Sequence, residues 1–204
     1  MAFKTGQNPN HPRKGASIKV EPIRELEVIA RIKNNLLEAR QFRNYCLFTL
    51  GINTAWRANE ILSLDVGRVR QLNAGDVLDL KQSKTGQYRA VALNQTAIEA
   101  IQLWLCYHPC KSGDNSALFP SRQFGRLGVP ALCNLVKQWC KGAGANGQFG
   151  SHTLRKTWGY HQRVTFNEPL VLISRALGHT SEAQTLRYIG LLPHEVTELY
   201  RHEI

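Results

Sequence analysis

A single change of hydrophobic period constrains the fold of this chain most. Residues 76–82, DVLDLKQ, and 87–93, QYRAVAL, alternate apolar and polar side chains, as β-strands do. The SKTG segment between them contains a glycine, which suits a tight reversal. Elsewhere the apolar residues recur at helical spacing. The sequence therefore predicts a mainly α-helical, α+β fold with one small antiparallel β-hairpin.

The helical segments can be placed from their apolar stripes and their end signals. We expect an amphipathic helix from Pro22, where proline is allowed in the first turn, and an N-terminal cap at Asn94. Glycines at 142 and 178 are expected to close two helices. The predicted helices cover about 22–36, 40–51, 57–64, 95–108, 128–142, 152–164 and 169–177, one begins near 181, and a terminal one begins at 193.

Length and charge bound the organisation and the partner. The 204 residues suit a single domain, which we place at 21–204 behind a flexible basic arm at 1–20. Lys and Arg number 26 against 15 Asp and Glu, a net charge of +11. The arm holds +4 of this charge and no acid, so the folded body is basic too. Such an excess favours a polyanionic partner, nucleic acid first, although a basic surface that only aids solubility would look the same.

Two classes of protein are disfavoured. The longest apolar run, YCLFTLGI at 45–52, falls far short of the roughly 20 residues that cross a bilayer. The opening residues are polar and do not resemble a secretory signal peptide. We therefore expect a cytoplasmic protein that does not enter a membrane.

The five cysteines do not predict a disulfide framework, because their number is odd. A zinc site can be imagined from Cys106, His108, Cys110, Cys133 and Cys140, but the spacing fits no standard ligand pair. Cys106 and Cys133 stand among apolar residues. Reduced thiols in the core are the favoured interpretation, with no metal and no cofactor expected.

The segment SHTLRKTWGYH, residues 151–161, offers a candidate phosphate site. His152 and Arg155 lie three positions apart, so they share one face near the start of the predicted helix. Free backbone amides and the helix dipole favour an anion there, and a guanidinium adds paired hydrogen bonds. By itself such a pair occurs in any basic helix, so the prediction of a phosphate site needs support from residues elsewhere in the chain.

Four further residues could belong to the same phosphate site. Arg57 follows Trp56 at a turn between apolar helices, although Glu60 three residues on could hold it for structural reasons alone. Lys84 stands at the hairpin tip, where most lysines are merely solvated. His179 lies in a helix break, and Tyr188 a little over two turns into the next helix. The break leaves their mutual geometry open.

Taken together and in order, four segments resemble the tyrosine recombinase, or phage integrase, family. That family carries an arginine in a segment like TGLRxSELLxL, a lysine in a β-hairpin, a box HxLRH, and LGH followed by a tyrosine in a stretch like TxxYxH. This chain has TAWRANEILSL, SKTGQYRAVAL, SHTLRKTWGYH and LGHTSEAQTLRYIG. The resemblance covers about residue 22 to the end, the catalytic domain of the family. By position it implies a candidate catalytic set of Arg57, Lys84, His152, Arg155, His179 and Tyr188.

The resemblance has three departures. Lys156 replaces the second histidine of HxLRH, Ala55 and Trp56 replace the usual glycine and leucine, and no counterpart of the separate N-terminal core-binding domain is found. A compact enzyme and a catalytic fragment both fit the last departure. Six tyrosines are candidates for the nucleophile, and only the resemblance selects Tyr188.

The resemblance implies a site-specific DNA recombinase or integrase that cuts DNA through a 3′-phosphotyrosyl intermediate. Tyr188 would attack the phosphorus, and Arg57 and Arg155 would bind the phosphate. His152 would take the proton of the phenol, whose pKa the arginine charges would lower. Lys84 would protonate the leaving 5′ oxygen, and His179 would donate to the phosphate. The implied partner is double-stranded DNA with specific sites. A homotetramer is expected on that DNA, and the C-terminal helix, about 192–204, would be exchanged between subunits.

Two other functions remain open at this point. A type IB topoisomerase-like enzyme uses equivalent chemistry to relax supercoils. A DNA-binding protein without catalysis would keep only the basic surface.

Overall fold

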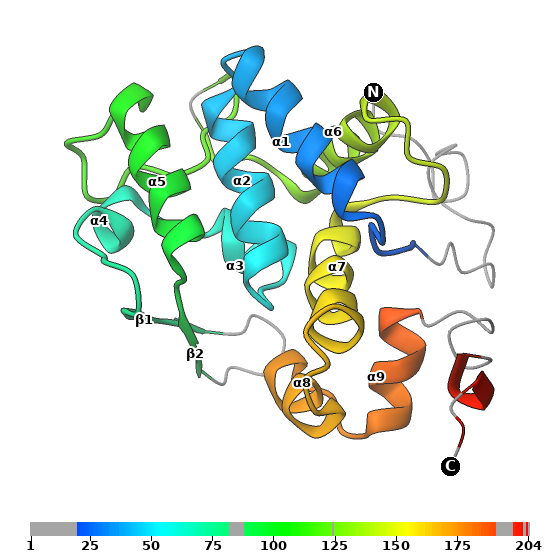
Figure 1. The fold of residues 1–204 in the computed structure, drawn as a ribbon. Helices are drawn as coiled ribbons and strands as arrows, with labels where there is room; N and C mark the ends of the chain where they lie inside the picture. Colours follow the sequence, from blue (N-terminus) through cyan, green and yellow to red (C-terminus); the bar gives the residue numbers. More distant parts are fainter. Residues whose placement is uncertain (1–19, 82–87, 124, 191–197, 202, 204) are drawn as a thin grey trace, which may run out of the picture.

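The computed structural model describes residues 20–81, 88–123, 125–190, 198–201 and 203, and it is mostly helical with one small sheet (Figure 1). This confirms the predicted fold class. The elements are α1 Leu26–Glu38, α2 Phe42–Asn53, α3 Ala58–Leu62, α4 Val66–Val69, β1 Val77–Lys81, β2 Tyr88–Ala92, α5 Gln95–Tyr107, α6 Val129–Gly142, α7 Ser151–Val164, α8 Leu170–Leu177, α9 Glu182–Ile189 and the 3₁₀ turn η1 Glu198–Arg201. Within these ranges no helix has the length and apolar character needed to cross a bilayer.

Strands β1 and β2 pair antiparallel, as the alternating pattern predicted. The register runs from Val77 opposite Ala92 to Lys81 opposite Tyr88. Leu78 and Leu80 are buried on the inner face of this sheet. The hairpin tip, with Lys84, lies outside the described residues.

The main core gathers around α2, which packs closely against α5 and α7. Its largest fully buried side chains include Phe48, Trp56 and Phe119. A Cβ at Gly51 would lie 2.5 Å from Cδ1 of Leu154, so glycine is what lets α7 approach α2 this closely. This contact fixes α7, the helix that carries His152 and Arg155.

A second, smaller core lies where α7, α8 and α9 meet. It contains Tyr160, Ile173, Leu177 and Ile189, with Tyr188 packed against its edge. A Cβ at Gly159 would come within 2.9 Å of Ile189, so α9 rests almost directly on the α7 backbone. The lower part of Figure 1 shows these three helices side by side.

The first helix starts four residues later than predicted, at Leu26. Tertiary hydrogen bonds explain the difference, because they use the backbone of Ile23 before a helix could. The Ile23 amide donates to Oγ1 of Thr157 at 2.8 Å, and its carbonyl lies 2.9 Å from Nε2 of His161. Ile23 is therefore buried, as its place in the apolar pattern suggested, but outside the helix.

Most predicted helix ends are confirmed. The side chain of Asn94 accepts the Ala97 amide, and Ser181 accepts the amide of Gln184. Gly178 ends α8 in the left-handed conformation, with φ of 62°. The short helix α4 was not predicted, since four residues carry no period. The arm at 1–19 and most of the predicted C-terminal helix lie outside the described residues.

Candidate active site

Helix α7 places its basic residues at the junction of the two cores. Arg155 is only 4% exposed, and its Nη2 donates to the carbonyl of Leu177, the last residue of α8. Burial is the main reason why its pKa falls to about 10, and the charges of Arg57 and Arg89 act in the same direction. Such a guanidinium is already desolvated and aimed before any ligand arrives, which lowers the cost of binding an anion.

A buried carboxylate holds Arg57 at the start of α3. Glu60 is 3% exposed, accepts the Arg57 amide at 2.7 Å and pairs with its Nη1 at 3.0 Å. The structural role that the sequence allowed for Glu60 is therefore present. Arg89 of β2 also reaches this carboxylate, with Nη2 3.8 Å from Oε1, while its Nη1 donates to the Ala55 carbonyl at 2.6 Å. One carboxylate thus ties two guanidiniums from separate elements together.

Tyr188 on α9 faces cations and a histidine ring. The central guanidinium carbon of Arg155 lies 6.0 Å from the centre of its ring, and Nζ of Lys156 lies 5.0 Å from it. The ring of His179 stands edge-on at 4.9 Å between centroids. The Tyr188 hydroxyl is buried and has no hydrogen-bond partner among the described residues. It therefore remains available for a partner other than the described residues.

The acidity of Tyr188 differs from the expectation. Arg155, Arg57 and Arg89 do act to lower the pKa of the phenol, but burial outweighs them and the pKa is raised. The predicted effect of the arginine charges is thus present, but it does not set the net pKa of the phenol in the free protein, because the sequence did not show that the hydroxyl is desolvated. A base that accepts the proton of Tyr188 must overcome the effect of this burial before the phenolate forms.

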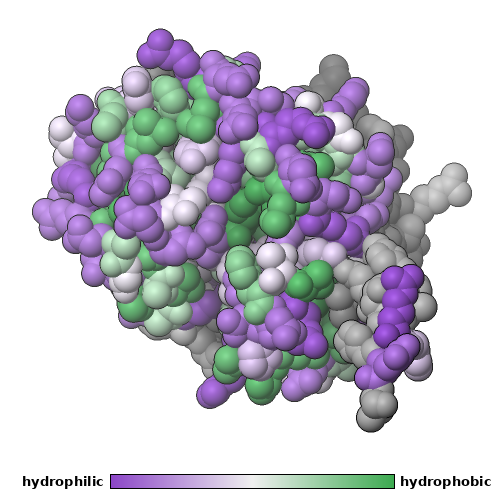
Figure 2. Space-filling model, viewed as in Figure 1, coloured by the Kyte–Doolittle hydropathy of each residue, from purple (hydrophilic) through white to green (hydrophobic). Residues whose placement is uncertain are grey.

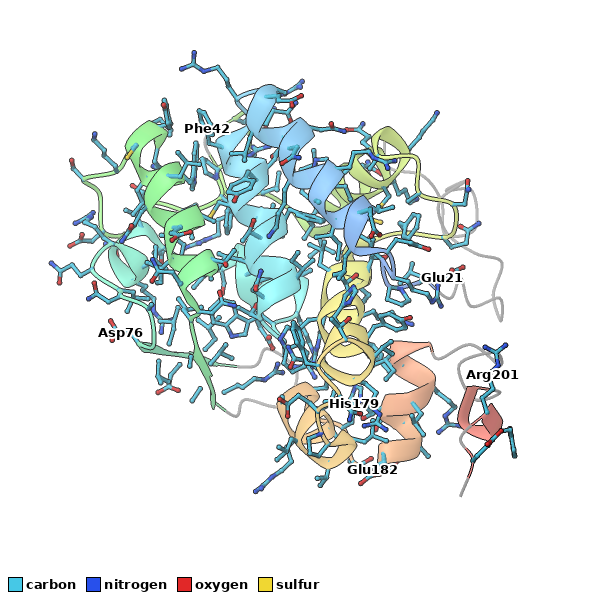
Figure 3. All side chains as sticks on the ribbon, viewed as in Figure 1. Glu21, Phe42, Asp76, His179, Glu182 and Arg201 are labelled. Atoms are coloured by element: carbon cyan, nitrogen blue, oxygen red, sulfur yellow. The ribbon has the colours of Figure 1, made fainter. Side chains whose placement is uncertain are left out.

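His179 is anchored on its inner side. Its Nδ1 lies 2.8 Å from Oγ1 of Thr185, one turn before Tyr188 on α9. Figure 3 shows His179 between α8 and α9, below the end of α7. Burial lowers its pKa to about 4, and the positive charges of Arg155, Arg57 and Arg89 add to this effect. The ring is therefore neutral at pH 7 in the free protein.

His152 belongs to the same electrostatic cluster. It lies in the first turn of α7 and is exposed, unlike Arg155. Desolvation of its ring, followed by the charges of Arg155, Lys156 and Arg57, lowers its pKa. A neutral imidazole at the surface of the cluster is in the correct state to accept a proton. Of the six candidates, only Lys84 is not described by the structure.

Sequence reasoning missed three residues of this site. Arg89 looked like one polar position of an alternating strand. Lys156 was noted only as a departure from the motif, and Thr185 carried no signal beyond its place in the resemblance. Two other tyrosines differ from what their places in the sequence suggest. Tyr107 falls on the apolar stripe of its helix, which predicts a place in the core, but it is 51% exposed. Tyr160, which stood among polar neighbours, is 6% exposed and belongs to the second core.

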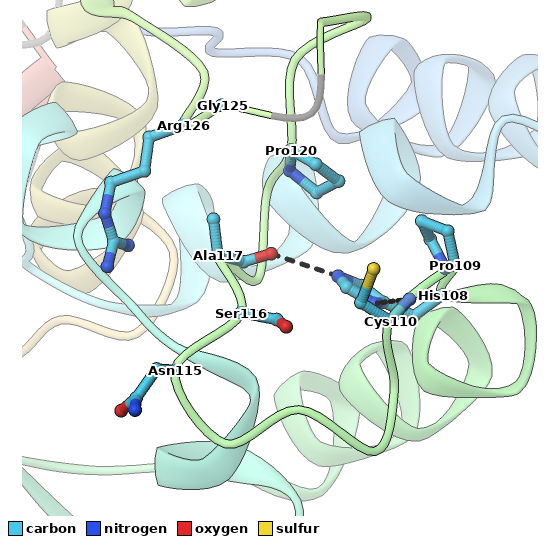
Figure 4. Close-up of a pocket in the computed structure, with 9 residues that line it drawn as sticks. All are labelled: His108, Pro109, Cys110, Asn115, Ser116, Ala117, Pro120, Gly125 and Arg126. Atoms are coloured by element: carbon cyan, nitrogen blue, oxygen red, sulfur yellow. Dashed lines mark hydrogen bonds between the residues drawn. The ribbon is translucent and has the colours of Figure 1, made fainter.

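The cluster lies apart from a pocket of about 280 Å³ between the end of α5 and the loop before α6 (Figure 4). In that pocket, Nε2 of His108 lies 3.0 Å from the Ala117 carbonyl, and Nδ1 accepts the Cys110 amide. Both ring nitrogens are therefore engaged by backbone. Cys106 is exposed, so its expected place in the core is wrong. The described part of the chain has no group of three or more metal-ligating side chains.

The face of the molecule in Figure 2 is mostly hydrophilic, with hydrophobic residues in smaller groups among the polar ones. A second cavity, about 350 Å³, borders the cluster and is lined by Arg89, Trp158 and Arg175 among others. It connects β2 with α7 and α8. The candidate site is thus bordered on the β2 side by a cavity to which Arg89 and Arg175 contribute the charged side chains.

Known proteins resemble this chain over most of its length. It is 33% identical over 175 residues to the probable integrase/recombinase YoeC of Bacillus subtilis, which covers 84% of this chain and 90% of that protein. It is 28% identical to the tyrosine recombinase XerC of Caldanaerobacter subterraneus, covering 80% of this chain but 45% of XerC. The chain therefore spans nearly all of YoeC and about half of that XerC.

Solved structures show the same fold. The crystal structure of XerA recombinase matches with a TM-score of 0.71 at 21% identity, covering 94% of this chain and 66% of that one. XerH site-specific recombinase, bound to its palindromic difH substrate, matches with a TM-score of 0.69 at 23% identity, covering 90% and 53%. The sequence profile of the Phage integrase family matches residues 23–195. On this evidence, and with the motifs now gathered in one place, the chain belongs to the phage integrase family.

Proposed function

We propose that the chain is a site-specific DNA recombinase that cuts and rejoins DNA through a 3′-phosphotyrosyl intermediate. The observation that carries this proposal is the surrounding of Tyr188. A phenol whose hydroxyl has no hydrogen-bond partner among the described residues faces Arg155 and Lys156, within the field of Arg57 and Arg89. Cleavage of a phosphodiester combines these two features: the phenol attacks the phosphorus, and the fixed cations stabilise the negative charge on the phosphate oxygens.

The roles follow from charge and position. Arg57 and Arg155 bind the nonbridging oxygens, where negative charge grows as the phosphorus is attacked. His179 donates to the same phosphate. Lys84, on the hairpin, protonates the departing 5′ oxygen. Because a second strand's hydroxyl reverses the reaction and conserves the bond energy, the proposed chemistry needs neither ATP nor a metal ion.

Activation of Tyr188 is the difficult step. An ordinary phenol with a pKa of about 10 is only about 0.1% ionised at pH 7, a penalty of roughly 4 kcal/mol. Burial of Tyr188 raises its pKa further. We assign the base to His152, because desolvation and then the neighbouring cations lower its pKa and keep it neutral and ready to accept the proton.

A trapped intermediate tests this function. A nicked duplex that loses its short cut strand by diffusion cannot be resealed, so the enzyme stays attached to DNA. We expect a denaturant-resistant adduct that disappears in Tyr188→Phe. Tyr200→Phe is the matched control, because the side chain of Tyr200 is 85% exposed. If wild-type protein forms no adduct on any site recovered from DNA bound in cells, the chain is a binding protein only.

Strand exchange decides between two uses of the same chemistry. A recombinase joins strands of two different duplexes, whereas a type IB topoisomerase-like enzyme reseals only the strand that it cut. We expect joined products from two labelled duplexes. Relaxation of supercoils without such products would support the topoisomerase alternative.

We also propose that the chain acts as a homotetramer on DNA and exchanges its C-terminal segment, about 192–204, between subunits. The proposal rests on family membership, since most of this segment lies outside the described residues. Truncation after Leu192 is expected to reduce assembly on DNA while leaving the fold intact. Undiminished tetramers from the truncated chain would contradict the exchange.

A further inference from the structure

A short chain of hydroxyl groups stands behind His179. Nδ1 of His179 lies 2.8 Å from Oγ1 of Thr185, which lies 2.8 Å from Oγ of Ser174. Ser174 in turn donates to the carbonyl of Leu170 at 2.8 Å. Thr185 is fully buried and Ser174 is 6% exposed, so water does not compete for these groups.

Counting protons along this chain leaves one arrangement. The Leu170 carbonyl can only accept, so the single proton of Ser174 points toward it. Ser174 must then accept from Thr185, which spends the single proton of Thr185. Thr185 can therefore only accept from His179. The reverse direction would leave two oxygens, of Ser174 and Leu170, 2.8 Å apart with no proton between them. A weaker contact of 3.4 Å from Thr185 to the Ser181 carbonyl does not change the order.

We infer that Thr185 and Ser174 are positioning residues that fix the proton of His179 on Nδ1, so that Nε2 can donate to a phosphate only after the ring takes up a second proton. The first half concerns the free protein. The second half rests on the proposed function, in which His179 faces the scissile phosphate.

The electrostatic surroundings make this proton uptake depend on the ligand. The charged and titratable groups that face His179 come from four other places in the fold. They are Arg57 at the start of α3, Arg89 on β2, Arg155 on α7 and Tyr188 on α9, and Lys156 of α7 lies against the ring of that tyrosine. Burial and, after it, the charges of the arginines hold His179 neutral in the free protein. A bound phosphate neutralises the arginine charges and adds one of opposite sign. The phosphate thereby creates the donor that it needs.

This arrangement gives a specific consequence for recognition. A neutral ring with its proton on Nδ1 turns a lone pair toward the ligand, which repels a phosphate oxygen. The site therefore binds a phosphate together with a proton. Without the hydroxyl chain, the ring could move its one proton to Nε2 and donate while still neutral.

Three variants separate these states. Thr185→Val removes the acceptor while keeping the shape of the side chain, and Thr185→Ser keeps the hydroxyl as the matched control. Ser174→Ala removes the far end of the chain without touching His179. The tautomer is read from long-range proton–nitrogen correlations of the histidine rings in the free, full-length protein at pH 7.5.

We expect wild type and Thr185→Ser to carry the proton on Nδ1. Thr185→Val should shift the ring to the Nε2 tautomer or to a mixture, and Ser174→Ala should move it part of the way. A wild-type ring protonated on Nε2 would overturn the inference, as would a tautomer unaffected by Thr185→Val in a folded variant.

Titration of the same ring with inorganic phosphate as the probe tests the proton uptake. In wild type, phosphate should raise the pKa of His179 by about one unit or more. In Thr185→Val the rise should be less than half as large. Equal rises would refute the linkage. These readouts need no DNA cleavage, so a failed adduct assay with the predicted tautomer would reject the proposed function and leave the hydroxyl chain standing.

Discussion

The guanidinium of Arg155 faces the ring of Tyr188 at 6.0 Å while its Nη2 is anchored on the Leu177 carbonyl. One side chain thus links α7, the end of α8 and the tyrosine of α9. Arg155→Lys keeps the charge but loses the planar fork and the anchor. We expect single-turnover cleavage of the nicked duplex to fall about 10²–10³-fold, the usual effect of losing one preorganised donor. A variant that cleaves at the wild-type rate would show that Arg155 does not contact the reacting phosphate.

Arg89, which the sequence did not single out, belongs to the same guanidinium cluster as Arg57. Its guanidinium joins the Ala55 carbonyl to Glu60, and Glu60 holds Arg57. Arg89→Met leaves the carbonyl without its donor, which typically costs about 1–3 kcal/mol. We expect a matching fall in urea stability and a loss of cleavage larger than this fall explains. Arg126→Met is the control, because Arg126 pairs with Asp65 at an exposed site, and it should retain cleavage. Equal losses of cleavage in the two variants would contradict the role of Arg89.

Gly159 sets the distance between α7 and the helix of Tyr188. Gly159→Ala places a Cβ 2.9 Å from Ile189 and 3.4 Å from Leu177, and such overpacking costs about 1–3 kcal/mol. Gly142→Ala meets nothing within 4 Å and should be neutral or slightly stabilising. Urea unfolding measures both. Equal stabilities would show that α9 can move away freely, and cleavage by the folded Gly159→Ala protein reports whether Tyr188 moved with it.

The stability of the free protein should depend on the pH through His179. The folded pKa is about 4 and the ordinary value 6.5, so between these values the unfolded chain binds a proton that the folded chain does not. The free energy of unfolding therefore decreases as the pH falls through this window. His152 and His161 act in the same direction. His179→Gln should make the slope shallower in urea unfolding at pH 7.5 and pH 5. Slopes that coincide would place His179 in solvent.

The sequence predicted the parts of the fold that local rules control. The antiparallel hairpin, the caps at Asn94 and Ser181 and the left-handed Gly178 all follow from signals within a few residues. The late start of α1 does not, because Ile23 is held by residues of α7 far along the chain. Long-range hydrogen bonds of this kind leave no trace in a single sequence.

The candidate site also combines features that the sequence predicted with features that only the folded chain shows. Family resemblance selected Arg57, His152, Arg155, His179 and Tyr188, and the structure brings all five into one electrostatic cluster. The sequence could not show that burial raises the pKa of Tyr188 against the effect of the arginines, nor that Glu60 joins Arg57 to Arg89. Both depend on desolvation and on contacts between distant elements, which only the folded chain defines.

Identification of the attached residue tests the central claim most directly. The trapped adduct is digested with protease and nuclease, and mass spectrometry locates the remaining nucleotide. We predict a 3′-phosphonucleotide on the peptide that contains Tyr188, and no modified peptide in Tyr188→Phe. A nucleotide attached to Tyr160, Tyr200 or any other side chain, or linked through its 5′ phosphate, would contradict the account.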